Sequence, residues 1–119
     1  MYLLYAHARI ASIIRKSGKN PEELAASGAR VTLGHEAEVA LALHVARFPE
    51  ALEAMLDELT PNRIADYLYE LSGIFNQFYA ECQVVGSDFE DSRLLLAESA
   101  AIVMRKCFDL LGITPLYRI

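Results

Sequence analysis

The side chains best suited to binding a ligand lie in two short stretches of the chain. They are Tyr5, Arg9, Ser12 and Lys16 near the start, and Asn76 and Tyr79 in the second half. Each stretch places a phenol beside polar or cationic groups, and an unpaired nucleobase can stack on such a ring while a cation holds a phosphate. We therefore expect a binding surface at these residues and no catalytic residues.

Other reactive residue types form no recognisable site. His7, His35 and His44 lie on separate segments, and the pair His35-Glu36 lacks a second histidine four residues on, so we expect no metal and interpret the histidines as surface or capping residues. The sequence has no glycine-rich phosphate loop and no nucleophile elbow. We expect no cofactor in this domain, and nucleotide activation is excluded on it.

Length and composition indicate one helical domain. The chain has 119 residues, of which 54% are hydrophobic, with no Trp and four Pro. That is enough for a single core, and no apolar run reaches the ~18 residues of a membrane span. We expect a cytoplasmic protein without a leader or a membrane partner, in which Cys82 and Cys107 are reduced core thiols.

Charge is distributed unevenly along the chain. The net charge of −5 disfavours a polyanionic partner, and we expect no DNA. However, the chain up to Asn20 holds four cations, Arg9, Arg15, Lys16 and Lys19, and no acid. The positive end therefore coincides with the first aromatic stretch.

Hydrophobic periodicity predicts the helices that position these residues. The first runs from Tyr2 to Ser17 and ends at Gly18; Leu3, Ile10 and Ile14 form its apolar stripe, and Tyr5, Arg9, Ser12 and Lys16 share the opposite face. Gly18 to Gly34 is expected to be mostly loop, in which Pro21 could start a short helix capped by Asn20.

Four more helices are expected, at His35 to Arg47, Pro49 to Leu59, Pro61 to about Val84, and from a cap among Ser87, Asp91 and Ser92 to Leu111. The expected buried residues are Val39, Ala42, Leu43 and Ala46; Leu52, Met55, Leu56 and Leu59; Ile64, Leu68, Leu71, Phe75, Phe78 and Cys82; and Leu94, Ala97, Ala101, Met104, Phe108 and Leu111. With no convincing strand pattern, the predicted fold is an all-α bundle of four long helices plus one short helix.

Several ordered motifs carry a family resemblance over nearly the whole chain. They are Tyr2 to Arg9 with Ile10 and Ile14, Phe48-Pro49-Glu50, Tyr67-Leu68-Tyr69, Phe75 to Val84, Ser92-Arg93-Leu94, and Leu110 to Ile113. In these motifs the chain resembles the C-terminal anticodon-binding domain of arginyl-tRNA synthetases, which has the DALR-type fold.

The resemblance implies a class I synthetase whose separate catalytic domain activates arginine with ATP and Mg. In such an enzyme this bundle binds the anticodon loop of the arginine tRNA. The signature motifs of that catalytic domain are absent here. We therefore expect an excised domain, residues 1–119, whose Met1 replaces upstream sequence, whose partners are the arginine tRNA and the missing catalytic domain, and which is not catalytic by itself.

Residue by residue, the resemblance implies that Tyr5, Arg9, Tyr79 and the terminal residue Ile119 contact anticodon bases, with the middle cytosine as the expected target. Family members commonly end in Glu-Arg-Met, whereas this chain ends Tyr117-Arg118-Ile119, so Ile119 ranks below the tyrosines. On the helical wheel Tyr79 borders the buried ridge, where its ring could be buried with only the hydroxyl exposed. Tyr5 and Arg9 are thus expected to form the exposed face, and Tyr79 its opposite wall.

Two other functions remain open from the sequence. A protein–protein interaction bundle, as a freestanding relative of this domain, fits the net charge of −5 and the large apolar faces. An autonomous enzyme has no specific motif in its favour.

Overall fold

The structure, a computed structural model, describes residues 2–118 and consists there of six helices. They are α1 (Tyr2–Ser17), α2 (Pro21–Ala26), α3 (Glu36–Ala46), α4 (Phe48–Glu58), α5 (Asn62–Glu81) and α6 (Glu90–Leu111). The all-helical bundle is confirmed. No helix in the described part of the chain is long and apolar enough to cross a membrane.

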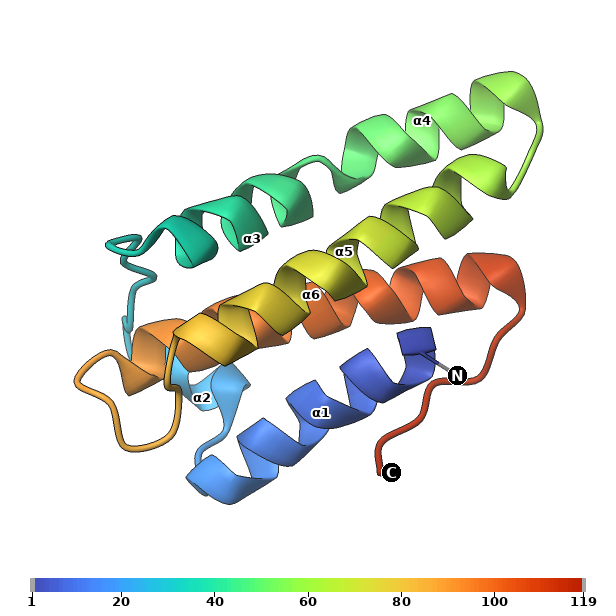
Figure 1. The fold of residues 1–119 in the computed structure, drawn as a ribbon. Helices are drawn as coiled ribbons and strands as arrows, with labels where there is room; N and C mark the ends of the chain where they lie inside the picture. The colour runs from blue at the N-terminus through green and yellow to red at the C-terminus, as the bar shows by residue number, and fades with distance from the viewer. Residues whose placement is uncertain (1, 119) are drawn as a thin grey trace.

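The two longest helices form the centre of the bundle (Figure 1). α5 packs against α1, α3, α4 and α6, and α6 also contacts α1, α2 and α3. The predicted ridge of α5 is confirmed, since Ile64, Leu68, Leu71, Phe75 and Phe78 are all fully buried. A core this well covered holds α1 and the end of α5 in fixed relative positions.

The first helix ends where the sequence predicts. Gly18 follows it with a φ of 69°, a left-handed conformation that suits glycine. α2 begins at Pro21, and the Asn20 side chain accepts a hydrogen bond from the backbone N–H of Glu22 at 2.9 Å. Lys19 then joins the end of α1 to the start of α6 through ion pairs with Glu90 and Asp91, both at 2.7 Å.

The prediction of the buried face of α3 is wrong. Val39 is 36% exposed and Leu43 is 54% exposed, whereas Ala37, Glu38, Leu41 and His44 are buried. Because α3 is apolar on nearly every side, its hydrophobic pattern does not select a face.

Two polar side chains determine which face of α3 is buried. The Glu38 carboxylate accepts from the backbone N–H of His35 at 2.8 Å and from Nε of Arg93 on α6 at 3.1 Å. His44 Nε2 lies 3.2 Å from the carbonyl oxygen of Tyr67 on α5, and the Tyr67 hydroxyl donates to the His44 carbonyl at 2.6 Å. These bonds satisfy groups that would be costly to bury unpaired.

Two histidines differ from their expected positions. His35 is a capping residue as predicted, since its Nδ1 accepts from the backbone N–H of Ala37 at 3.0 Å. His7 and His44, expected at the surface or at caps, are instead buried. Both cysteines are buried free thiols, as predicted.

The expected core residues of α4 are largely exposed. Leu56 is 60% exposed and Leu59 is 89% exposed, while Leu52 and Met55 are only half-buried. α4 packs on α5 and meets α3 only at their junction, so only one of its sides is covered. Leu59 follows the helix with a φ of 52° and caps it in the left-handed conformation.

The segment between α5 and α6 also differs from the prediction. α5 ends at Glu81, not Val84, because Cys82 adopts an extended conformation. α6 begins at Glu90 without a side-chain cap; Ser87 instead accepts from the N–H of Phe89 at 3.2 Å, and Glu90 accepts from that of Gly86 at 2.6 Å. Ser87, one of the expected caps, and Glu90 therefore close the preceding turn.

Candidate nucleic-acid interface

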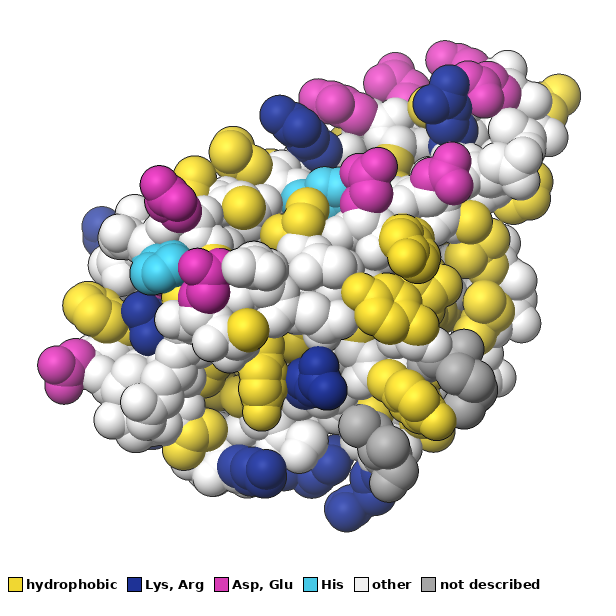
Figure 2. All heavy atoms as spheres, in the orientation of Figure 1, with side chains coloured by type: hydrophobic (Ala, Val, Ile, Leu, Met, Phe, Trp, Pro, Cys, Tyr) yellow, Lys and Arg dark blue, Asp and Glu magenta, His cyan; other side chains and the backbone are white. Residues whose placement is uncertain are grey.

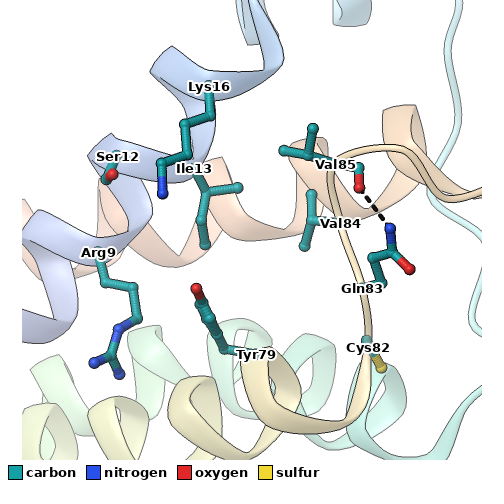
Figure 3. A pocket seen from close by; sticks show the side chains of 9 residues that line it. All are labelled: Arg9, Ser12, Ile13, Lys16, Tyr79, Cys82, Gln83, Val84 and Val85. Atoms are coloured by element: carbon teal, nitrogen blue, oxygen red, sulfur yellow. Dashed lines mark hydrogen bonds between the residues drawn. The ribbon is translucent and has the colours of Figure 1, made fainter.

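A cavity of about 460 Å³ opens between α1 and the end of α5 (Figure 3). Its lining comes from three parts of the chain: Arg9, Ser12, Ile13 and Lys16 on α1, Tyr79 on α5, and Cys82, Gln83, Val84 and Val85 in the segment that follows. The apolar members form its floor and the cationic and hydroxyl groups its rim. A flat ring with an anionic substituent fits such a site.

Three of the predicted residues share this cavity because of their helical spacing. Arg9, Ser12 and Lys16 are separated by three and four residues, so they lie on one face of α1. Arg9 and Lys16 are exposed and Ser12 is half-buried. Within residues 2–118, neither cation forms an ion pair with a carboxylate, so both charges are available to an incoming anion.

Tyr79 projects into the cavity from the opposite wall (Figure 3). Its side chain is 42% exposed, so the alternative of a ring buried up to its hydroxyl does not hold. The Arg9 guanidinium carbon lies over the ring, 5.1 Å from its centroid. This cation–π contact joins the two predicted walls, with Val84 and Val85 across the cavity from Arg9.

Asn76 supports this pair from beside the cavity. Its Oδ1 accepts from Arg9 Nη1 at 3.0 Å, and its Nδ2 donates to the Tyr2 hydroxyl at 3.1 Å. Tyr2 in turn packs against Tyr69, with ring centroids 5.5 Å apart. Asn76 is therefore engaged at both ends and orients Arg9.

Another predicted site residue, Tyr5, does not line the cavity. Tyr5 is 40% exposed and lies one helical turn before Arg9 on the same face of α1. It extends the surface beyond the cavity rim. Ile119 lies outside the described residues.

The sequence reasoning missed the segment from Cys82 to Val85. Val84 is buried and Val85 is 37% exposed, and together they supply the apolar wall that faces α1. The Gln83 side-chain amide donates to the carbonyl oxygen of Val85 at 2.9 Å, which fixes the turn before Gly86. The adjacent pair Val84-Val85 just before a glycine could have indicated this wall.

Positive and negative side chains lie on different parts of the surface. Figure 2 shows Lys and Arg side chains along the edge formed by α1, and acidic side chains over α4. The acidic residues of α4 are Glu50, Glu53, Asp57 and Glu58. A polyanion is thus attracted to the cavity side of the molecule and repelled from α4, despite the net charge of −5.

No group of three or more His, Cys, Asp or Glu within residues 2–118 is arranged to hold a metal ion. Burial disfavours the thiolate form of both buried cysteines, because it raises the pKa of Cys107 to about 12 and also raises the pKa of Cys82. The site can bind and orient a ligand through stacking and charge.

Comparisons with known proteins show which proteins the chain is similar to. The model of the DALR anticodon binding domain family matches residues 3–119. Two Arabidopsis thaliana proteins, the cytoplasmic and the chloroplastic/mitochondrial arginine–tRNA ligases, are each 58% identical over all of this chain, which spans 20% and 18% of their lengths. The crystal structure of arginyl-tRNA synthetase from Plasmodium falciparum superposes with a TM-score of 0.88 at 33% identity, over 99% of this chain and 21% of that one.

Proposed function

The chain belongs to the DALR anticodon binding domain family, and from this premise we propose that it binds the anticodon loop of an arginine tRNA as one domain of an arginine–tRNA ligase. The relatives named arginine–tRNA ligase are about five times longer than the chain, which spans 20% of the first of them. The proposal therefore assigns recognition to this chain and catalysis to another part of the protein.

The observation that supports the proposal is the contact of Tyr79 with Arg9 in the lining of a cavity of about 460 Å³. An everted base can stack on the exposed part of the Tyr79 ring or on the guanidinium plane, and both surfaces suit every base. The apolar wall of Val84 and Val85 then shields the base from water. Stacking of this kind contributes about 1 to 3 kcal/mol per base.

The polar residues at the cavity rim would select the bound base and orient it. Arg9 and Lys16 provide N–H donors for a phosphate or for the acceptor atoms on the edge of a base, and Ser12 provides a hydroxyl between them. Cytosine has two such acceptors, O2 and N3, in addition to its amino group. We propose the middle anticodon base, a cytosine in arginine tRNAs, as the base bound here.

Tyr5 and Ile119 complete the proposed surface. Tyr5, exposed one turn before Arg9, would contact a neighbouring nucleotide of the loop. The terminal residue is proposed as an apolar contact, weaker than the methionine common in the family.

The relatives suggest what the other parts of the proposed enzyme do. A catalytic part outside this chain would activate arginine with ATP and Mg and transfer it to the bound tRNA. We propose a cytoplasmic location, as for one of the two Arabidopsis thaliana relatives.

Comparing activation with charging in a full-length ligase that contains this chain tests the proposal. Replacing Tyr79 or Tyr5 with alanine should reduce arginine charging, while ATP-dependent arginine activation changes less, because the arginine and ATP sites would lie in the catalytic part outside this chain. Unchanged charging kinetics in both variants would contradict the proposal and favour a protein-interaction role.

A further inference from the structure

The segment after α6 folds back along α1 and is held there by a few polar contacts. We call residues 113–118 the tail. The carbonyl oxygen of Leu116 accepts from Nδ1 of His7 at 2.8 Å, and that of Tyr117 accepts from Nη1 of Arg15 at 2.9 Å. The Tyr117 ring meets the His7 ring edge-on at a centroid distance of 5.1 Å.

His7 is fully buried and both of its ring nitrogens have partners. Nδ1 faces a carbonyl, which can only accept, so Nδ1 carries the hydrogen. Nε2 lies 3.2 Å from Nη1 of Arg105, which can only donate, so Nε2 is the acceptor. Arg105 is itself fixed by Glu98 at 2.8 Å. The site therefore accepts only the neutral ring in one tautomer.

The tail is only partly packed against the bundle. A cavity of about 220 Å³ adjoins the tail at Tyr117 and is also bordered by His7 and Arg15. Tyr117 is 51% exposed and Arg118 is exposed. The hydrogen bonds from His7 and Arg15 thus carry much of the attachment.

We propose that His7 is a positioning residue that holds the tail against α1, so that Arg118 joins Arg15 and Lys16 in the surface that binds RNA. The inference has two parts. The contribution of the tail to RNA binding rests on the proposed anticodon-binding function, whereas the attachment of the tail by His7 does not depend on that function. His7 has no exposed atoms in the docked state and acts on RNA only through the tail.

The attachment depends on pH because protonation removes the Nε2 acceptor and places a second positive charge beside Arg105. The charged and titratable groups around the ring are Arg105 and Glu98 from α6, Arg15 from α1 and Tyr117 from the tail. Burial, and secondarily Arg105, keep the pKa of docked His7 below the usual 6.5, although the bond to Leu116 opposes this. Docking is therefore strongest above pH 6.5 and weakens as the pH falls from 6.5 through the lowered pKa of His7.

The first measurement is the rate at which a carboxypeptidase digests the tail of the 119-residue chain, divided by its rate on an unstructured peptide of the same terminal sequence. His7→Leu should raise the ratio about tenfold at pH 7.5, since one buried hydrogen bond is lost. The matched control is His44→Leu, which removes the other buried histidine and its bond to Tyr67 but leaves the tail contacts intact. An equal ratio in both variants and the wild type would overturn the proposal.

The pH profile of the wild-type chain needs no variant that might fail to fold. The digestion ratio should rise as the pH falls below 6.5. A flat profile while the chain stays folded would overturn the proposal.

The RNA part is tested by a double-mutant cycle with an arginine tRNA. Deletion of residues 114–119 should weaken the tRNA Kd, His7→Leu should weaken it by no more than the deletion does, and the combined variant should lose no more than the deletion alone. Additive losses would overturn the role of the tail in RNA binding. If the wild-type chain shows no preference for an arginine tRNA, the proposed function fails, while the digestion assay still decides the tail attachment.

Discussion

Removing the Tyr79 ring should weaken RNA binding by a predictable factor. Tyr79 is the only aromatic residue that lines the cavity in the described part of the chain, and 42% of its surface is exposed. Loss of one stacked base costs about 1 to 3 kcal/mol, which is about 5- to 150-fold in Kd. We expect Tyr79→Ala to weaken binding of an arginine-tRNA anticodon hairpin within this range, and Tyr79→Phe to remain close to wild type because the ring persists.

Fluorescence anisotropy of a labelled hairpin measures the Kd, and thermal unfolding checks that each variant is folded. Phe89→Ala is the matched control, because Phe89 is also exposed and also carries an arginine, Arg93, at 5.1 Å from its ring centroid, but it lies outside the cavity. The reasoning is refuted if folded Tyr79→Ala binds the hairpin like the wild type, or if Phe89→Ala loses as much affinity.

Other variants test the electrostatics and the core. Lys16→Ala should reduce the slope of log Kd against log salt concentration by about 0.7, as expected for one phosphate contact to a single strand; an unchanged slope would exclude that contact. Glu38→Ala should lower the free energy of unfolding in urea by about 3 to 5 kcal/mol, because it leaves Arg93 uncompensated near the core. Cys82 and Cys107 should react with iodoacetamide at pH 8 only in unfolding urea, since burial raises both pKa values, that of Cys107 to about 12; rapid labelling of the folded chain would contradict their burial.

Elements with a strong amphipathic pattern could be predicted from the sequence. The wheel of α1 places Arg9, Ser12 and Lys16 on one face, and these three residues share the cavity in the structure. The ridge of α5 is buried as expected, from Ile64 to Phe78. In both helices the apolar residues occupy a single stripe, so burial has one solution.

The elements that could not be predicted depend on long-range contacts. α3 is apolar on most sides, and its buried face is selected by polar partners on α5 and α6, Tyr67 and Arg93. The exit from α5 depends on the extended backbone of Cys82, which turns Val84 and Val85 toward α1. The sequence therefore predicts the face of α1 that lines the cavity, but not the wall formed by Val84 and Val85.

The central claim is that this chain recognises the anticodon of an arginine tRNA. Competition binding of the 119-residue chain with two versions of that tRNA, identical except for replacement of the middle anticodon cytosine by uracil, tests it most directly. One altered base should weaken binding by about 1 to 3 kcal/mol, or about 5- to 150-fold in Kd. Equal Kd values for the two RNAs would contradict the account.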